Sequence, residues 1–218
     1  MGKIKTAKYF PVIPVEPTVL QTLWLKLAGN RGVSTTRVAN RLPTPDQISR
    51  LPELWKRRFA PGIPLQRRQE SYGSWLCRKK LLALTEVGAL ISISHADRCV
   101  VGIGLSYLAA NQRGIAGVGV DIERSDRVVS AAFRQRIMSK KELARDFLHG
   151  LNGVEIWTVK EACFKADPGS SGSVVSQYQI VQFSEGSRRG VVKKKALQFA
   201  FFCVQDSSWT LAIAICTR

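Results

Sequence analysis

The sequence has few acidic residues and few histidines. Among its 218 residues, 16 Asp and Glu stand against 33 Lys and Arg, which gives a formal net charge of +17 at pH 7. A field of this strength attracts polyanions such as nucleic acid, a membrane surface, a phosphorylated cofactor or an acidic protein, but it does not decide the fold. With two histidines and no C-x-x-C pair, the sequence lacks the usual ligands of a zinc site.

Neither the cysteines nor the apolar residues form a concentrated pattern. The five cysteines are odd in number and scattered, which is typical of reduced thiols in a protein core rather than of disulfides. No apolar run approaches the roughly 20 residues that a membrane-spanning helix needs. The N-terminal residues lack the apolar centre of a secretory signal. We therefore expect a cytoplasmic protein without a membrane-spanning segment.

The sequence does contain an alternation of helical and strand-like segments. Hydrophobic residues make up 45% of the chain and charged residues 22%, an ordinary balance for a folded protein. Apolar spacing in the first half predicts helices followed by strands, with a loop over residues 29–44. The expected elements are an edge strand at 9–15, helices at 18–27, 46–59 and 65–84, and strands at 89–94 and 99–108.

The second half repeats this order. A strand at 115–122 precedes a capping box at Ser139–Glu142, which opens a helix that we expect to reach Leu148. The later elements are a helix at 154–166 and strands at 176–183, 189–193, 196–204 and 209–216. This order predicts an α+β fold of two similar halves in a pseudo-twofold arrangement, residues 1–112 and 113–218. The sequence shows no clear internal repeat.

Two glycine pairs resemble the start of a dinucleotide-binding loop. They are Gly102 with Gly104, and Gly117 with Gly119. Neither pair completes G-x-G-x-x-G, and we expect no helix directly after either strand. The sequence therefore does not predict a dinucleotide site.

The segment Gly119-Val120-Asp121-Ile122-Glu123 places two acids at a strand end. Side chains two apart on a strand share a face, so Asp121 and Glu123 point the same way while their apolar neighbours face the core. Adjacent carboxylates repel one another unless a cation lies between them, and ligation by oxygen alone suits Mg²⁺. The alternative is that both acids are simply solvated at the surface.

Residues 157–165 read Trp-Thr-Val-Lys-Glu-Ala-Cys-Phe-Lys and carry the complementary charges. The side chains that share one broad stripe of this helix are Trp157, Lys160, Glu161, Phe164 and Lys165. The two rings can anchor the stripe in the core, where the charged groups then need partners. Glu161 and Lys165, four residues apart, can simply pair with one another. Opposite the two strand acids, the same helix would instead help to hold Mg²⁺ and a diphosphate.

Together, the segments 119–123 and 157–165 resemble the paired signature of the 4′-phosphopantetheinyl transferases. The resemblance is to the larger, single-chain Sfp-type, which modifies carrier domains of peptide and polyketide synthases and acyl carrier proteins. The segment Ser92-Ile93-Ser94-His95 is similar to a third element of that family. The matching motifs span residues 92–165, and the N-terminal third agrees only in being basic and helical.

The resemblance implies an enzyme that transfers the 4′-phosphopantetheine arm of coenzyme A to a serine of an apo acyl or peptidyl carrier protein. Asp121, Glu123 and Glu161 would ligate Mg²⁺, or Mn²⁺ in its place. Glu161 would also take the proton of the serine. Lys165 would neutralise the diphosphate, Lys160 would support charge at the same end, and 3′,5′-ADP would leave. The expected partners are coenzyme A and an acidic carrier protein, and the pseudo-twofold plan favours a monomer.

The resemblance assigns the 3′-phosphate of coenzyme A to Ser94 and His95. Basic residues of the N-terminal half also grip this phosphate in the family, and Arg68 and Arg78 are the candidates here. The family's G-K-P element is missing, because residues 85–90 read Thr-Glu-Val-Gly-Ala-Leu. The nucleotide end would then be rebuilt from Arg78, Lys79 or Lys80, or coenzyme A would bind differently.

The remaining basic clusters are each typical of a solvated face, although together they exceed what solubility requires. They are Arg57-Arg58, Arg67-Arg68, Arg78-Lys79-Lys80, Arg188-Arg189 and Lys193-Lys194-Lys195. Two alternative functions stay open: a catalytically silent relative that binds coenzyme A, and a basic nucleic-acid-binding protein. Zinc-finger, RNA-recognition and helix-turn-helix signatures are absent, which disfavours the second.

Overall fold

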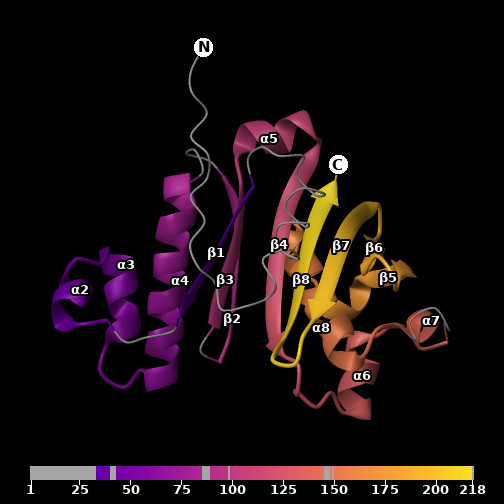
Figure 1. The fold of residues 1–218 in the computed structure, drawn as a ribbon, viewed down its shortest axis with the longest axis horizontal. Helices are drawn as coiled ribbons and strands as arrows, with labels where there is room; N and C mark the ends of the chain where they lie inside the picture. Colours follow the sequence, from indigo (N-terminus) through magenta and orange to yellow (C-terminus); the bar gives the residue numbers. More distant parts are fainter. Residues whose placement is uncertain are drawn as a thin grey trace.

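Two antiparallel sheets with helices packed against them make up the fold (Figure 1). The computed structural model describes residues 33–39 (backbone only), 43–84, 89–97, 99–144, 148 and 150–217. The strand expected at 9–15, the helix expected at 18–27 and residues 85–88 of the missing G-K-P element lie outside these ranges. Within them, no helix combines the length and the apolar character needed to cross a membrane.

The N-terminal half contains a three-stranded sheet in the order β1-β3-β2, with helix α4 against it. Its elements are β1 (Val33–Ala39), α2 (Pro45–Ser49), α3 (Glu53–Lys56), the 3-10 helix η1 (Arg57–Phe59), α4 (Leu65–Leu84), β2 (Leu90–Ala96), β3 (Cys99–Leu105) and α5 (Tyr107–Gln112). At Gly102 of β3, an added Cβ would collide with Cys77 and Leu81 of α4. The glycine therefore lets the helix lie close to the sheet.

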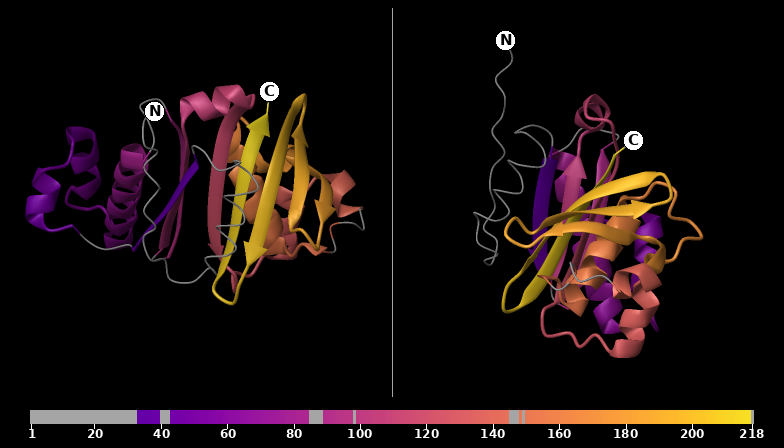
Figure 2. Two further views of the ribbon diagram at one scale, coloured as in Figure 1. Left: turned by 45° about the horizontal axis from the view of Figure 1, so that its top comes forward. Right: turned by 90° about the vertical axis from the view of Figure 1, so that its right-hand side faces the viewer.

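The C-terminal half contains a five-stranded sheet in the order β4-β8-β7-β6-β5, which Figure 2 shows from two further sides. Its elements are β4 (Ile115–Arg124), α6 (Ala131–Ile137), α7 (Lys140–Leu143), α8 (Gly153–Ala166), the 3-10 helix η3 (Val175–Gln177), β5 (Gln179–Ser184), β6 (Arg189–Lys194), β7 (Leu197–Gln205) and β8 (Trp209–Thr217). Helix α8 begins at a capping box of Asn152 and Glu155 and buries Ile156, Val159 and Cys163 in the core.

Two glycines of β4 bring helix α8 into backbone contact with the strand. A Cβ on Gly119 would overlap the carbonyl oxygen of Ala162, and one on Gly117 would overlap that of Ala166. Only glycine tolerates such an approach. This packing sets the acids of β4 beside the charged residues of α8.

The two sheets meet along β2 and β4. The backbone N–H of Val120 donates to Ser92 Oγ (3.0 Å) in a buried contact between the two halves. Both halves also share one connectivity: a first strand, a helix, and two later strands that pair in the order first, last, second. This holds for β1, α4, β2 and β3, and for β4, α8, β7 and β8. The α+β prediction is confirmed, whereas the domain boundary and the pseudo-twofold rotation stay predictions.

Several expected elements differ in the structure. The loop expected at 29–44 contains strand β1, and the helix expected at 46–59 is divided into α2, α3 and η1. Pro52 is the reason for the break between α2 and α3, because proline lacks a backbone N–H and disfavours helix at the residue before it. The capping box at Ser139 is confirmed, but α7 ends at Leu143 instead of Leu148.

Two short α-helices were not predicted, nor was the 3-10 helix η3, which occupies the start of the strand expected at 176–183. Helix α5 begins after the N-cap Ser106 and α6 after the N-cap Ser130, and in each the serine hydroxyl accepts a backbone hydrogen bond. Because α5 follows β3 directly, the expectation of no helix there is wrong. The dinucleotide loop is still unsupported, since Tyr107 occupies the position of its third glycine.

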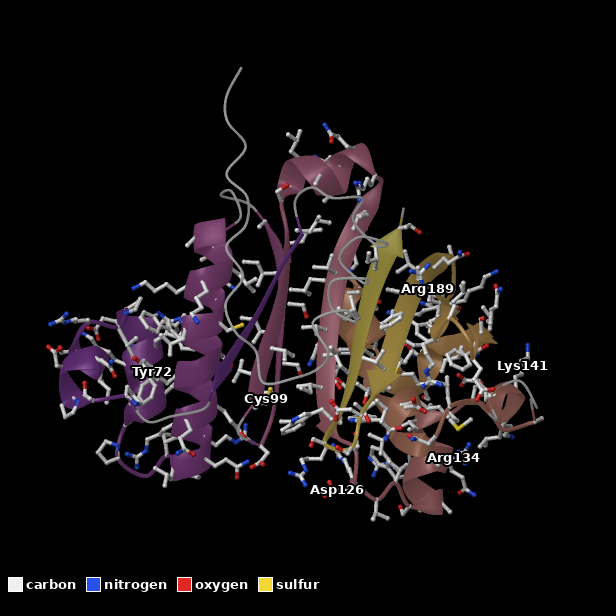
Figure 3. All side chains as sticks on the ribbon, viewed as in Figure 1. Tyr72, Cys99, Asp126, Arg134, Lys141 and Arg189 are labelled. Carbon is white, nitrogen blue, oxygen red and sulfur yellow. The ribbon has the colours of Figure 1, made fainter. Side chains whose placement is uncertain are left out.

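The cysteines and most basic clusters lie as expected, with two exceptions. All five cysteines are buried as reduced thiols, and burial raises the pKa of Cys77 to about 12. Basic side chains such as Arg134, Lys141 and Arg189 lie on the outside of the C-terminal half (Figure 3). Lys194 is instead buried and paired with Asp167 (2.5 Å), and Arg188 is paired with Glu155, so neither belongs to a solvated face.

Candidate active site

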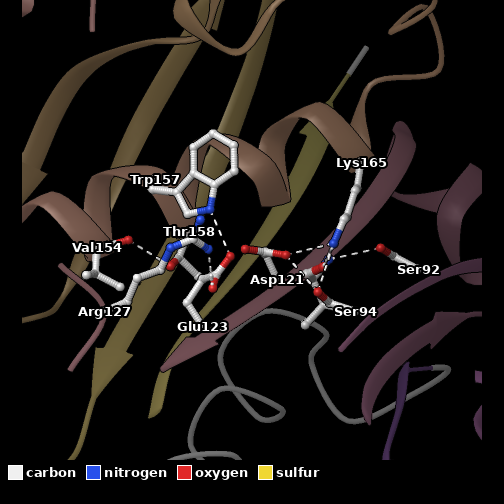
Figure 4. A network of polar contacts seen from close by, with 10 residues as sticks. Ser92, Ser94, Asp121, Glu123, Arg127, Val154, Trp157, Thr158 and Lys165 are labelled. Atoms are coloured by element: carbon white, nitrogen blue, oxygen red, sulfur yellow. Dashed lines mark hydrogen bonds and ion pairs between the residues drawn. The ribbon is translucent and has the colours of Figure 1, made fainter. Parts of the chain in front are cut away.

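Asp121 is the most deeply buried acid of the site, with 4% of its surface exposed. Its Oδ1 accepts hydrogen bonds from Ser94 Oγ and Lys165 Nζ, both at 2.7 Å (Figure 4). Its Oδ2 is buried without a hydrogen-bond partner among the described residues. Burial raises the pKa of the Asp121 carboxyl, and the Lys165 ammonium opposes this rise. An unsatisfied buried oxygen costs free energy and indicates a missing partner.

Lys165 extends from α8 toward the acids of β4, where its ammonium donates three hydrogen bonds. Its Nζ donates to Asp121 Oδ1 (2.7 Å), Ser94 Oγ (2.9 Å) and the carbonyl oxygen of Val120 (3.3 Å). An ammonium group has three hydrogens, so this network accounts for all of them. Lys165 therefore pairs with Asp121 rather than with Glu161 of its own helix, and its side chain is still 28% exposed.

Glu123 shares a strand face with Asp121 but is held by different partners. Its Oε1 accepts a hydrogen bond from Trp157 Nε1 (2.8 Å), and its Oε2 forms an ion pair with Arg127 (2.6 Å). The Arg127 guanidinium lies over the rings of Trp157 (5.8 Å) and Phe133 (5.9 Å). Both carboxylate oxygens of Glu123 are thus engaged by the protein.

Glu161 is the third acid, and it has no such partner. It lies half-buried on α8 and forms no hydrogen bond or ion pair with any residue in the described ranges. Burial raises the pKa of its carboxyl, and the negative charge of Asp121 raises it further. Glu161 therefore combines an available carboxylate with increased basicity.

The donor set fits a divalent cation only in part as it stands. The free oxygen of Asp121 and the unpaired carboxylate of Glu161 are oxygen ligands of the kind that Mg²⁺ prefers. Among the residues that the structure describes, however, no three or more acids, histidines or cysteines are grouped to hold a metal. The third acid, Glu123, is turned to Trp157 and Arg127. Two of the three expected ligands are thus available.

The residues expected at the nucleotide end do not converge. Ser94 is buried between Asp121 and Lys165, whereas its neighbour His95 points to the opposite face of β2 and pairs with Glu70 of α4 (3.1 Å). Arg68 Nε donates to the carbonyl oxygen of Ile63 (2.7 Å) near the start of α4. Arg78 is exposed ten residues further along, which is roughly 15 Å at the helical rise.

Lys160 is also separated from the acids of β4. It is fully buried, and its Nζ donates to Glu142 Oε2 (2.8 Å). Glu142 in turn accepts hydrogen bonds from the backbone N–H groups of Ile180 and Ser139. Burial lowers the pKa of Lys160, and Glu142 opposes this. The pair therefore connects α7, α8 and β5 instead of adding charge beside Asp121.

Three residues of the site were not assigned to it from the sequence. Arg127 lies on the loop after β4, where no periodic pattern places a side chain. Trp157 was expected only as a core anchor, yet its indole donates to Glu123. Ser92 belongs to the same motif as Ser94. Because side chains two residues apart on a strand share a face, the sequence could have indicated that both hydroxyls point toward the site.

Comparison with family models finds a match in the C-terminal half of the chain. Residues 117–216, which include all three acids, match the family model of the 4′-phosphopantetheinyl transferase superfamily. The match confirms the resemblance at the level of the superfamily for these residues. The superfamily implies transfer of phosphopantetheine from coenzyme A to carrier proteins. A search of curated proteins finds no match to the chain.

Proposed function

We propose that the chain is a Mg²⁺-dependent, Sfp-type 4′-phosphopantetheinyl transferase that modifies a serine of an apo acyl or peptidyl carrier protein. The observation that carries the proposal is the buried, unpartnered Oδ2 of Asp121, which lies within electrostatic range of the unpaired Glu161. Both acids belong to the segment that matches the superfamily. We further propose that the enzyme acts as a cytoplasmic monomer.

Asp121, Glu161 and Glu123 would hold the divalent cation, Mg²⁺ or Mn²⁺. When bound, the cation would neutralise the diphosphate of coenzyme A as charge develops on the leaving group. Asp121 and Glu161 offer free oxygens for this purpose, whereas Glu123 would first have to be released by Arg127. The raised pKa of both available acids fits this role, because a nearby positive charge would relieve their mutual repulsion.

Glu161 would act as general base. The serine oxygen would attack the β-phosphorus of coenzyme A and give its proton to the Glu161 carboxylate, while the bond to 3′,5′-ADP breaks and its electron pair leaves with the nucleotide. A carboxylate with a raised pKa is a better proton acceptor near neutral pH. Its freedom from hydrogen bonds with the described residues leaves the oxygen available to the incoming serine.

Lys165 and Ser94 would position the reacting groups from the β4 side. Lys165 holds Oδ1 of Asp121 and so leaves Oδ2 for the cation, and its partly exposed ammonium would also attract the diphosphate. Ser94 binds both Lys165 and Asp121 from a buried position, which supports an orienting role instead of a contact with the 3′-phosphate.

At the nucleotide end, His95 is the remaining candidate from the strand motif. Its imidazole is 43% exposed, and it would contact the 3′-phosphate on leaving Glu70. Arg68 and Arg78 are too far apart along α4 to be placed together on one phosphate by this helix alone. Lys160 acts through the packing of α8, because its ammonium is buried against Glu142.

The release of 3′,5′-ADP tests this proposal. The protein would be incubated with coenzyme A, Mg²⁺ and an apo acyl carrier protein, and the nucleotide would be measured by chromatography. Release that requires the acceptor serine of the carrier supports the transferase. Binding of coenzyme A without release of 3′,5′-ADP would identify a catalytically silent relative. Tight binding of nucleic acid, with neither coenzyme A binding nor release, would favour a nucleic-acid-binding protein.

A further inference from the structure

The ion pair between Arg127 and Glu123 suggests a step that precedes cation binding; this inference rests on the proposed function. The guanidinium lies 2.6 Å from Glu123 Oε2, and its side chain is 42% exposed. The protein engages both oxygens of Glu123: the indole of Trp157 donates to Oε1, and the guanidinium of Arg127 pairs with Oε2. The carboxylate is therefore neutralised by the protein before any cation arrives.

We propose that Arg127 is an exchangeable counter-ion of the metal site. It holds Glu123 while the site is free of cation, and it must release the carboxylate before Glu123 can act as a ligand. Arg127 is thus a positioning residue that sets the cation affinity of the free enzyme.

The charges at Glu123 explain why one partner must leave and the other can stay. The Trp157 indole is a neutral donor and occupies one acceptor site of Oε1, so the carboxylate keeps further lone pairs for a cation. The Arg127 guanidinium is a permanent positive charge in direct contact with Oε2. A divalent cation at the same carboxylate would be repelled by it at close range.

The other contacts of Arg127 allow it to move at small cost. Its guanidinium lies over Phe133 of α6 and Trp157 of α8, and these two rings pack edge to face at 4.9 Å. A planar guanidinium can shift over aromatic faces and keep much of this attraction. Glu123 is its one ion-pair partner among the described residues.

Lys165 differs from Arg127 in each of these respects. Its ammonium makes three hydrogen bonds within the β4 edge and is less exposed. Releasing Asp121 would leave those donors and a buried carboxylate without partners, which is costly. The site therefore contains one positively charged side chain that is fixed, Lys165, and one that can be exchanged, Arg127.

The experiment measures Mn²⁺ binding to the full-length protein without coenzyme A or carrier, by isothermal titration calorimetry. We expect Arg127→Gln to bind Mn²⁺ about fivefold more tightly than wild type, the range of a partly exposed ion pair. Arg136→Gln is the matched control, because it removes one charge from an exposed position of α6. Its affinity should equal that of wild type.

Equal or weaker Mn²⁺ binding by Arg127→Gln would overturn the exchange, because the guanidinium would then not oppose the cation. An equal gain in Arg136→Gln would also overturn it, since bulk charge alone would explain the result. The variant Asp121→Asn distinguishes a failure of the Arg127 inference from a failure of the proposed function. If Asp121→Asn binds as wild type does, the metal site itself is misassigned; if it loses binding while Arg127→Gln is unchanged, only the Arg127 inference fails.

Discussion

Lys165 Nζ lies 2.7 Å from Oδ1 of Asp121 and so connects helix α8 to strand β4 through a buried carboxylate. The second oxygen of Asp121 stays without a partner among the residues described. Lys165 therefore holds Asp121 through Oδ1 and leaves Oδ2 available to a ligand. The backbone approach at Gly117 and Gly119 makes this distance accessible to a lysine.

Replacing Lys165 tests whether this ammonium also serves coenzyme A. We expect Lys165→Met to weaken coenzyme A binding about tenfold, the range for loss of a charge-assisted contact. Isothermal titration calorimetry measures it. Lys193→Met is the suitable control because Lys193 is exposed on β6, whereas its neighbour Lys194 is buried and paired. Equal losses in both variants would show that coenzyme A responds only to bulk charge.

Neutralising Glu161 should stabilise the cation-free protein. The raised pKa of Glu161 means that the folded protein favours the protonated acid, so its stabilising contribution is present at acid pH and lost as pH rises through the folded pKa. At pH 7 the ionised carboxylate therefore lowers the free energy of unfolding. We expect Glu161→Gln to have a higher Tm than wild type at pH 7 and a smaller advantage near pH 4, measured by thermal denaturation.

Mg²⁺ should reverse this order. If Glu161 is a ligand as proposed, cation binding to the native state should raise the Tm of wild type and have little effect on Glu161→Gln. A Glu161→Gln protein that is less stable than wild type without Mg²⁺ would show that the carboxylate has a stabilising partner, contrary to the structure.

Gly119 should not tolerate any side chain. A Cβ at this position would overlap the backbone of α8 at Ala162, so we expect Gly119→Ala to lower the free energy of unfolding by about 1–3 kcal/mol or more. Urea denaturation measures the loss. Gly186→Ala is the control, since a Cβ there meets no atom within 4 Å. Similar stability of both variants would contradict the close packing of α8 on β4.

Lys160 should behave as part of the core. Removing it leaves Glu142 as an uncompensated buried charge, so we expect Lys160→Met to cost about 3–5 kcal/mol of stability. The remaining folded protein should bind Mn²⁺ with wild-type affinity. Normal stability together with weakened coenzyme A binding would instead favour the role at the diphosphate that the family resemblance implied.

The sequence predicted the elements of the site better than their partners. The strand acids and the basic helix are strong local patterns, and α4 has the bounds that its spacing predicted. Lys160 and Lys165 were placed on one stripe, yet residues five apart on a helix differ by about 140° in direction, which sends one to Glu142 and the other to Asp121.

Other differences come from contacts that no local pattern contains. Lys194 is the inward residue between two exposed lysines, as the strand period of two requires once the sheet face is known. Arg127 pairs with Glu123, four residues earlier in the chain, and its guanidinium lies over the rings of Phe133 in α6 and Trp157 in α8. Such a contact depends on tertiary packing, so the sequence could not show that Glu123 is occupied.

Intact-mass spectrometry of an apo acyl carrier protein would detect the proposed transfer itself. The carrier would be incubated with coenzyme A and this protein, with EDTA, and then with an excess of Mg²⁺ over EDTA. We predict a mass gain of one phosphopantetheine that is absent with EDTA, restored by Mg²⁺, and lost in Asp121→Asn. A gain that persists with EDTA or in Asp121→Asn would contradict the account of a cation held by the acids of β4 and α8.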